Sequence, residues 1–218
     1  MQDQQKFYTM EKTKTPVSIR IIYWLTEVSF WLVILSAAFV LAFNVLAFTP
    51  FFGNDLQLHV AFPVKFNVLD KGVLELHGKD LQVELVEASS KIHFINTPMY
   101  IARIFGTAML LAMGFLIYIA FLFRSFIVNV KKNRVFEPSN IAYLRNISYG
   151  LFGLWLFAVI YTRIFHRIVL HSISFEQVEL LEDHRRFAGL LLLSLFIWVL
   201  SHVFLVGAKM KEEQDLTI

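Results

Sequence analysis

The sequence contains no cysteine, and this absence excludes disulfide bonds, thiolate metal sites and lipidated cysteine. Charged residues are also scarce, at 17% of the 218 residues against about 25% in average globular domains. The chain has no serine-hydrolase elbow, no phosphate-binding glycine loop and no dinucleotide fingerprint. These absences predict a protein that is not an enzyme and needs no cofactor.

Apolar residues make up 57% of the chain and are gathered in four long runs. The runs are residues 28–48, 104–123, 147–162 and 187–208. A helix of about 20 residues crosses a hydrocarbon core of about 30 Å, and three of the runs reach that length. The third run is shorter, but it can span if Arg163 and Arg167 extend to the lipid headgroups. We therefore predict an α-helical membrane protein with a four-helix transmembrane bundle.

Four spans place both termini on the same side of the membrane. Lysine and arginine number 11 in the segments on that side and 9 on the other, and they are dense in residues 124–134. The positive-inside rule therefore predicts a multi-pass protein of the bacterial inner membrane with both termini in the cytoplasm. The predicted segments are a cytoplasmic N-terminus at 1–20, spans at 21–48, 99–127, 141–166 and 187–208, an extracytoplasmic β insertion at 49–98, a cytoplasmic loop at 128–140, an extracytoplasmic loop at 167–186 and a cytoplasmic tail at 209–218.

The segment 49–98 carries a strand pattern instead of a helical one. Apolar residues alternate in LQLHVAFPVKF (56–66), which predicts a strand, and Pro63 restricts that strand to an edge or a bulge. We expect three or four antiparallel strands, with KIHFI (91–95) as the last and turns at DKG (70–72) and HGKD (77–80). In the second outer loop, Phe175, Val178, Leu180 and Leu181 are expected to face one side of a helix that lies on the membrane or on the β layer.

Histidines are the main candidates for metal binding. His166, His171 and His184 lie in or near the second outer loop, but the five-residue spacing of the first two does not place them on one helical face. We predict no metal there, since histidine at the headgroup level is the commoner state. His202 lies inside the fourth run, where a neutral, hydrogen-bonded imidazole is expected.

Glu27 lies at the inner edge of the first span, and we expect it to form a structural ion pair with Arg124 or Arg145. An alternative function, transport or binding of a small solute or ion, would use Glu27, His202 and a cluster of outer arginines. That cluster consists of Arg103, Arg163 and Arg167.

Two stretches resemble a known family. NRVFEPSNIAYLRNISYG (133–150) contains Pro138, Ser139 and Asn140, which can start and cap the third helix. It resembles the inner-loop motif of a bacterial family of four-span membrane proteins, domain-of-unknown-function family 2975, and GAKMKEEQDLTI (207–218) resembles the ending of that family. Members are often encoded beside a small Cro/CI-type helix-turn-helix regulator. The resemblance implies a membrane-bound partner of such a transcription regulator.

The predicted function is therefore a non-enzymatic sensor or tether that binds and restrains a cytoplasmic helix-turn-helix regulator. The simpler interpretation of the tail is a solvated end held at the headgroups by Lys209 and Lys211. Direct nucleic-acid binding is not predicted, because the basic KKNR loop is an ordinary topology signal; homo-oligomer formation is left open. The predicted partner contacts are Phe136, Glu137, Asn140, Arg145, Glu212, Glu213, Gln214, Asp215 and Leu216.

Overall fold

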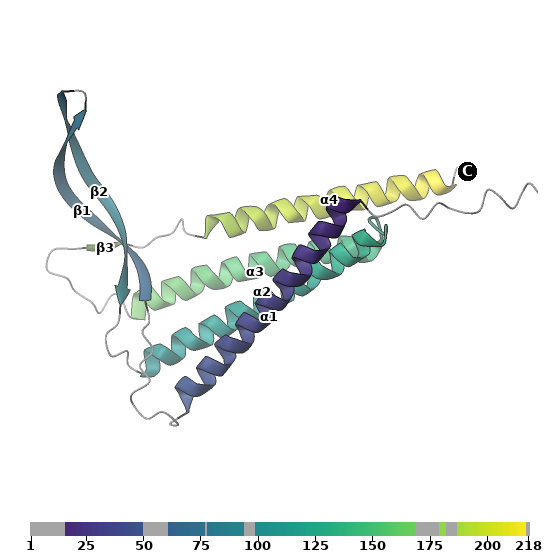
Figure 1. The fold of residues 1–218 in the computed structure, drawn as a ribbon, viewed down its shortest axis with the longest axis horizontal. Helices are drawn as coiled ribbons and strands as arrows, with labels where there is room; N and C mark the ends of the chain where they lie inside the picture. Colours follow the sequence, from purple (N-terminus) through teal and green to yellow (C-terminus); the bar gives the residue numbers. More distant parts are fainter. Residues whose placement is uncertain are drawn as a thin grey trace, which may run out of the picture.

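The structure, a computed structural model, describes residues 16–49, 61–76, 78–93, 99–168, 179–181 and 187–216. Long helices and a small sheet alternate along these parts of the chain (Figure 1). In chain order the elements are α1 (Val17–Phe48), β1 (Ala61–Leu76), β2 (Lys79–His93), α2 (Met99–Lys131), α3 (Pro138–Ile168), β3 (Glu179–Leu181) and α4 (Ala188–Leu216).

The helices confirm the predicted four membrane spans. Each contains a stretch that is long and apolar enough to cross a bilayer. At 29 to 33 residues each helix is roughly 45 Å long, so its ends reach beyond a hydrocarbon core of about 30 Å. The α3 helix begins at Pro138, within the predicted start signal and ahead of the predicted span at 141; proline fits there because the first N–H groups of a helix have no partner within it.

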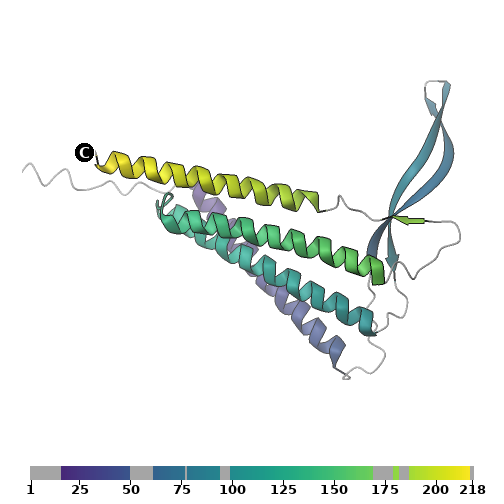
Figure 2. The same cartoon turned by 180° about the vertical axis from the view of Figure 1, so that it is seen from behind.

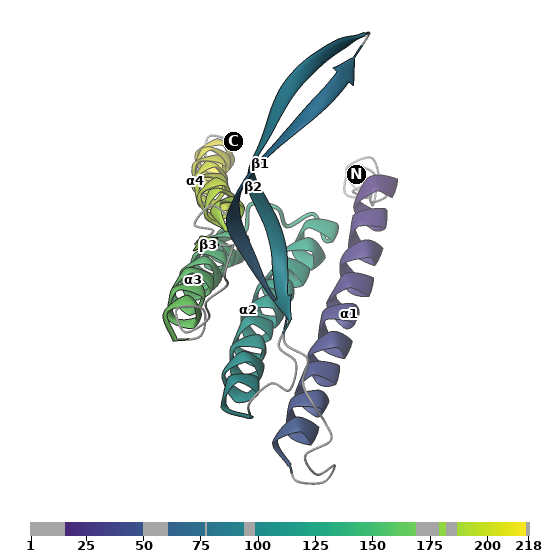
Figure 3. The same ribbon diagram turned by 90° about the vertical axis from the view of Figure 1, so that its left-hand side faces the viewer.

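The helices pack side by side in chain order. The α1 helix packs on α2, α2 on α3, and α3 on α4, so that α1 and α4 form the two edges of a row (Figure 3). The sheet lies at one end of the helices along their length, here called the hairpin end. The α2–α3 connection lies at the opposite end, here called the loop end (Figure 1).

Glycines allow close approach between neighbouring helices. A Cβ atom at Gly106 of α2 would collide with Oδ1 of Asn44 on α1, whose amide nitrogen donates to the Val40 carbonyl at 2.8 Å. A Cβ at Gly153 of α3 would lie 2.9 Å from Cε1 of Phe115 on α2. Small residues serve this purpose in membrane proteins, where close van der Waals contact drives helix association.

The α3–α4 contact combines apolar packing with one buried hydrogen bond. The Ser194 hydroxyl of α4 donates to the Ser148 carbonyl of α3 at 3.0 Å. Next to it, Leu122 of α2 packs with Ile147 and Leu151 of α3 to form a buried apolar cluster. The cluster ties the three consecutive helices together because residues of α4 also pack against it.

The predicted small antiparallel β insertion is confirmed. Strands β1 and β2 form a long hairpin that closes at Gly78, where a φ of 72° favours glycine, so the predicted turn at HGKD is also confirmed. The β3 strand pairs with residues 65–67 of β1, giving the sheet order β2-β1-β3. Pro63 lies outside the part of β1 that β3 covers, as a residue without an N–H donor requires.

Three details predicted for the two outer segments are wrong. The chain does not turn at DKG (70–72): β1 continues through it, with a bulge between Asn67 and Asp70 that inserts an extra residue and keeps the two strands paired. Residues 91–93 belong to β2 and do not begin a fourth strand. Leu180 and Leu181 lie in a strand, not in a helix, because the edge of β1 supplies backbone partners there. Phe175 and Val178 lie outside the described residues.

Candidate functional site at the loop end

The α2–α3 connection, residues 132–137, is built around one buried amide. Asn140 has an exposed fraction of 0%. Its nitrogen donates to the carbonyls of Arg134 at 2.6 Å and Val135 at 3.0 Å, and its oxygen accepts from the Asn129 amide at 2.9 Å. Asn133 adopts a left-handed φ of 61°, a conformation that asparagine tolerates better than most residues. The connection is therefore a fixed structure.

This geometry gives Asn140 an internal role. Its three hydrogen bonds join the end of α2, the connection and the start of α3. The prediction that Asn140 contacts a partner directly is untested, but its side chain offers no exposed surface for one. The Glu137 side chain, also a predicted contact, lies 3.5 Å from Arg134 and accepts a bond from Ser139.

Phe136 connects this loop to α4. Its ring lies 5.8 Å from the Phe204 ring, and a Cβ at Gly207 would lie 2.8 Å from its Cε1 atom. Phe204 also packs against Phe126 of α2, with 6.0 Å between the two ring centroids. Gly207 thus leaves the space into which the loop aromatic packs. The structure brings the two stretches that carry the family resemblance into direct contact at this point.

Beyond this contact, α4 continues as a helix to Leu216 and extends past the α2–α3 connection (Figures 1 and 2). We call residues 209–216 the α4 arm. The simpler interpretation of the tail as a solvated end does not predict this helix. Its described side chains are exposed, including Met210 at 57% and Leu216 at 81%. The last turn has no basic residue, although the negative end of the helix dipole favours bases there.

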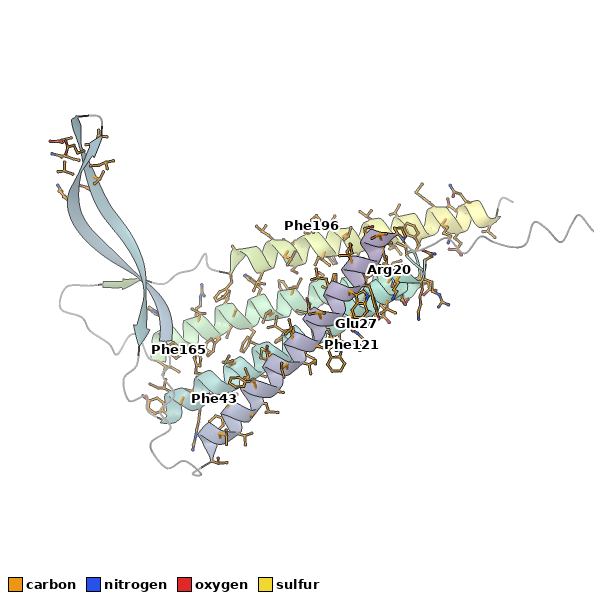
Figure 4. All side chains as sticks on the ribbon, in the orientation of Figure 1. Arg20, Glu27, Phe43, Phe121, Phe165 and Phe196 are labelled. Carbon is orange, nitrogen blue, oxygen red and sulfur yellow. The ribbon has the colours of Figure 1, made fainter. Side chains whose placement is uncertain are left out.

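An ion pair joins α1 and α2 near the loop end, at the position of Glu27 in Figure 4. Arg124 donates to both carboxylate oxygens of Glu27 at 2.8 Å, and the Tyr23 hydroxyl donates to the same carboxylate at 3.0 Å. Lys131 lies 3.5 Å from the centre of the Tyr23 ring, within the range of a cation–π contact. The predicted pairing of Glu27 is confirmed, with Arg124 as the partner, and these bonds occupy both of its oxygens.

The histidine candidates do not form a metal site among the described residues. His171 and His184 are not described, and within the described parts no group of three or more metal-ligating side chains comes together. The His202 ring places Nδ1 3.0 Å from the Trp198 carbonyl and packs edge-on against that indole. The carbonyl can only accept, so Nδ1 donates in this bond.

The remaining predicted side chains are exposed along the helices. Arg145 lies on the exposed face of α3, near its start at the loop end. Arg103 of α2 lies 5.8 Å from the Phe48 ring of α1, at the hairpin end. Arg163 and Arg167 lie in the last two turns of α3, and His166 between them is half-buried. Asn129, Phe204 and Gly207, which build the loop contacts, are not among the predicted site residues.

Comparison with known proteins gives one match. Residues 85–218, more than half of the chain, match the family described as "Protein of unknown function (DUF2975)". This range includes α2, α3, the connection between them and α4 with its arm. No curated protein and no solved structure matches the chain. The protein therefore belongs to the DUF2975 family, which confirms the resemblance seen in its loop and in its C-terminal residues.

Proposed function

We propose that this membrane protein tethers a soluble protein at its loop end, and that the α4 arm is the main contact. The observation that carries the proposal is the continuation of α4 beyond the α2–α3 connection as an exposed helix. An exposed helix at the end of a span is suited to docking on a partner.

The surface of the arm supports a protein partner. Met210 and Leu216 expose most of their surface, and a contact would remove that apolar area from water. Glu212 and Glu213 lie beside them and are exposed. Acidic residues at the negative end of a helix repel its dipole, and a basic partner surface would relieve this repulsion.

The loop contacts support a rigid platform behind the arm. Phe136 packs at Gly207, just before the arm begins, and Asn140 fixes the backbone that carries Phe136. A partner that binds the arm therefore lies next to Glu137 and the exposed edge of Phe136. In this proposal the loop end faces the cytoplasm of a bacterial cell.

The partner class follows from the family resemblance. A small helix-turn-helix regulator has the basic surface that DNA binding requires, and this surface complements an acidic arm. The proposed consequence is retention of the regulator at the inner membrane, away from DNA. The hairpin at the opposite end of the helices would receive the signal that changes this retention.

The test first asks whether a small helix-turn-helix regulator is encoded beside this chain in its own genome, and then uses that regulator. The full chain and a version lacking residues 212–218 are expressed with this regulator, and the regulator that co-purifies with the membrane protein is measured. We expect the truncation to abolish co-purification and to leave the membrane protein folded, because its four spans and the Phe136–Gly207 contact remain. Undiminished co-purification, or the absence of an adjacent regulator, contradicts the proposal.

A further inference from the structure

The far half of the β1–β2 hairpin, residues 70–85, extends across and beyond the helices (Figures 1 and 3). Leu74 lies opposite Leu81, and Gly72 opposite Val83, so these residues share one face. Leu74, Leu81 and Val83 are between 44% and 49% exposed. A two-stranded hairpin alone is only marginally stable in water, and it gains stability from a third strand or a packed face.

One edge of this hairpin is open for pairing. The β3 strand covers only residues 65–67 of β1, which leaves residues 70–76 without a neighbour on that side among the described strands. Val73 lies at the middle of this open edge and is 67% exposed. An open edge with unpaired backbone groups is a template for another strand.

The charges on the other face of the hairpin are unevenly matched. Lys71 lies opposite Glu84, and their charged atoms approach to 3.5 Å. Glu75 lies opposite Asp80, so two acids face each other near the turn. Like charges that lie directly opposite in a sheet are destabilising. Glu75 would gain from a base supplied on its open side.

We propose that two copies of this chain pair through the open edges of β1, antiparallel and centred on Val73. This register places Val73 against Val73 of the second copy. It also places Lys71 of each copy opposite Glu75 of the other, so the pairing is complementary in charge. The two hairpins become one four-stranded sheet, and the exposed faces that carry Leu74 and Leu81 become continuous.

The same arrangement through β2 lacks this complementarity. Centred on Gln82, it would set Asp80 of one copy against Glu84 of the other, which places acid against acid twice.

The symmetry axis of the proposed β1–β1 dimer is perpendicular to the sheet. Seen along the helices, the two strands lie side by side near the tip (Figure 3), which suits an axis along the membrane normal and two copies in the same bilayer.

The absence of cysteine in the natural chain gives a direct test. Val73→Cys in the full chain, in native membranes under a mild oxidant, should form a disulfide-linked dimer. Opposed antiparallel residues have Cα atoms about 4.5–5.5 Å apart, within the range of a disulfide. Gln82→Cys is the matched control, since Gln82 lies directly opposite Val73 on β2 and is also exposed. A Val73→Cys yield no higher than that of Gln82→Cys overturns the proposal.

Charge variants in the Val73→Cys background separate the dimer from the hairpin. Glu75→Lys replaces the Glu75–Asp80 repulsion by an attraction, so it should strengthen the hairpin itself. It also sets Lys71 of each copy against the introduced lysine of the other, and the disulfide yield should fall by about five-fold. Adding Lys71→Glu restores complementarity between copies and keeps one attractive and one repulsive pair within each hairpin, so the yield should recover. Equal yields from the Glu75→Lys variant and this charge swap contradict a β1–β1 contact and leave the exposed face to another protein or to lipid.

Discussion

Replacement of Asn140 by alanine should loosen the entire loop end. The substitution removes three hydrogen bonds of 2.6, 3.0 and 2.9 Å, and all of them meet at a side chain that is fully buried. Each such bond contributes about 1 kcal/mol, so the loss should be about 3 kcal/mol. For a chain of this size, that loss lowers the melting temperature by about 6–12 °C.

The assay is thermal denaturation of the purified protein in detergent. Size-exclusion chromatography measures the protein that stays folded at each temperature. Ser125→Ala is the control, because its hydroxyl bonds only to the Phe121 carbonyl of its own helix and ties no two elements together. Asn140→Asp should destabilise at least as much as Asn140→Ala, since a carboxylate would face the carbonyls of Arg134 and Val135. If Asn140→Ala melts within about 1 °C of Ser125→Ala, the amide does not organise the loop end and the reasoning fails.

Three further predictions concern the helix contacts, and all use the same melting assay. Gly106→Ala should destabilise because its Cβ collides with Asn44, whereas Gly114→Ala should not, because no atom lies within 4 Å of the added Cβ; equal effects would contradict the α1–α2 packing. Gly207→Ala should displace Phe136 and destabilise more than Gly189→Ala, whose Cβ also meets nothing within 4 Å; a neutral Gly207→Ala would refute the aromatic contact. Arg124→Gln should destabilise by about 2–4 kcal/mol because it leaves Glu27 without its cation, and adding Glu27→Gln should recover part of that loss; a loss in the double variant equal to the sum of the losses in Arg124→Gln and Glu27→Gln would show that the pair is not coupled.

The helices could be predicted because their signal is carried by long apolar runs. The ion pair of Glu27 could also be predicted, since a charge in a span requires a partner and few cations lie at its level. The choice of Arg124 over Arg145 could not, because it depends on which face of α1 meets α2. The structure makes this choice by placing α1 against α2 at the edge of the row.

The β segment shows where local pattern fails. Asp70, Lys71 and Gly72 have the composition of a turn, but a bulge absorbs the irregularity and the strand continues. The pairing of Leu180 and Leu181 with β1 depends on a contact more than 100 residues distant in sequence. No periodicity within residues 167–186 contains that information.

The sequence indicates the inner loop and the tail as the partner-binding region, but it does not predict how the two pack together. The position of Asn140 beside Pro138 indicates a helix start, but a buried amide network cannot be distinguished from an exposed polar loop by sequence alone. Gly207 is a contact surface for Phe136 only because of how α4 lies against the connection. The sequence does not predict the helical state of the α4 arm, since its acidic residues are typical of a solvated end.

The α4 arm is proposed to bind a soluble partner, and binding between purified components tests this most directly. The measurement is the dissociation constant of the proposed partner, a small helix-turn-helix regulator encoded beside this chain, for the full chain in lipid nanodiscs. Leu216→Ala, at the end of the arm and 81% exposed, should weaken binding by about ten-fold or more, as expected for an apolar anchor. Leu192→Ala, at the opposite end of the same helix and 67% exposed, should leave binding unchanged. Equal affinities for the two variants would contradict the account.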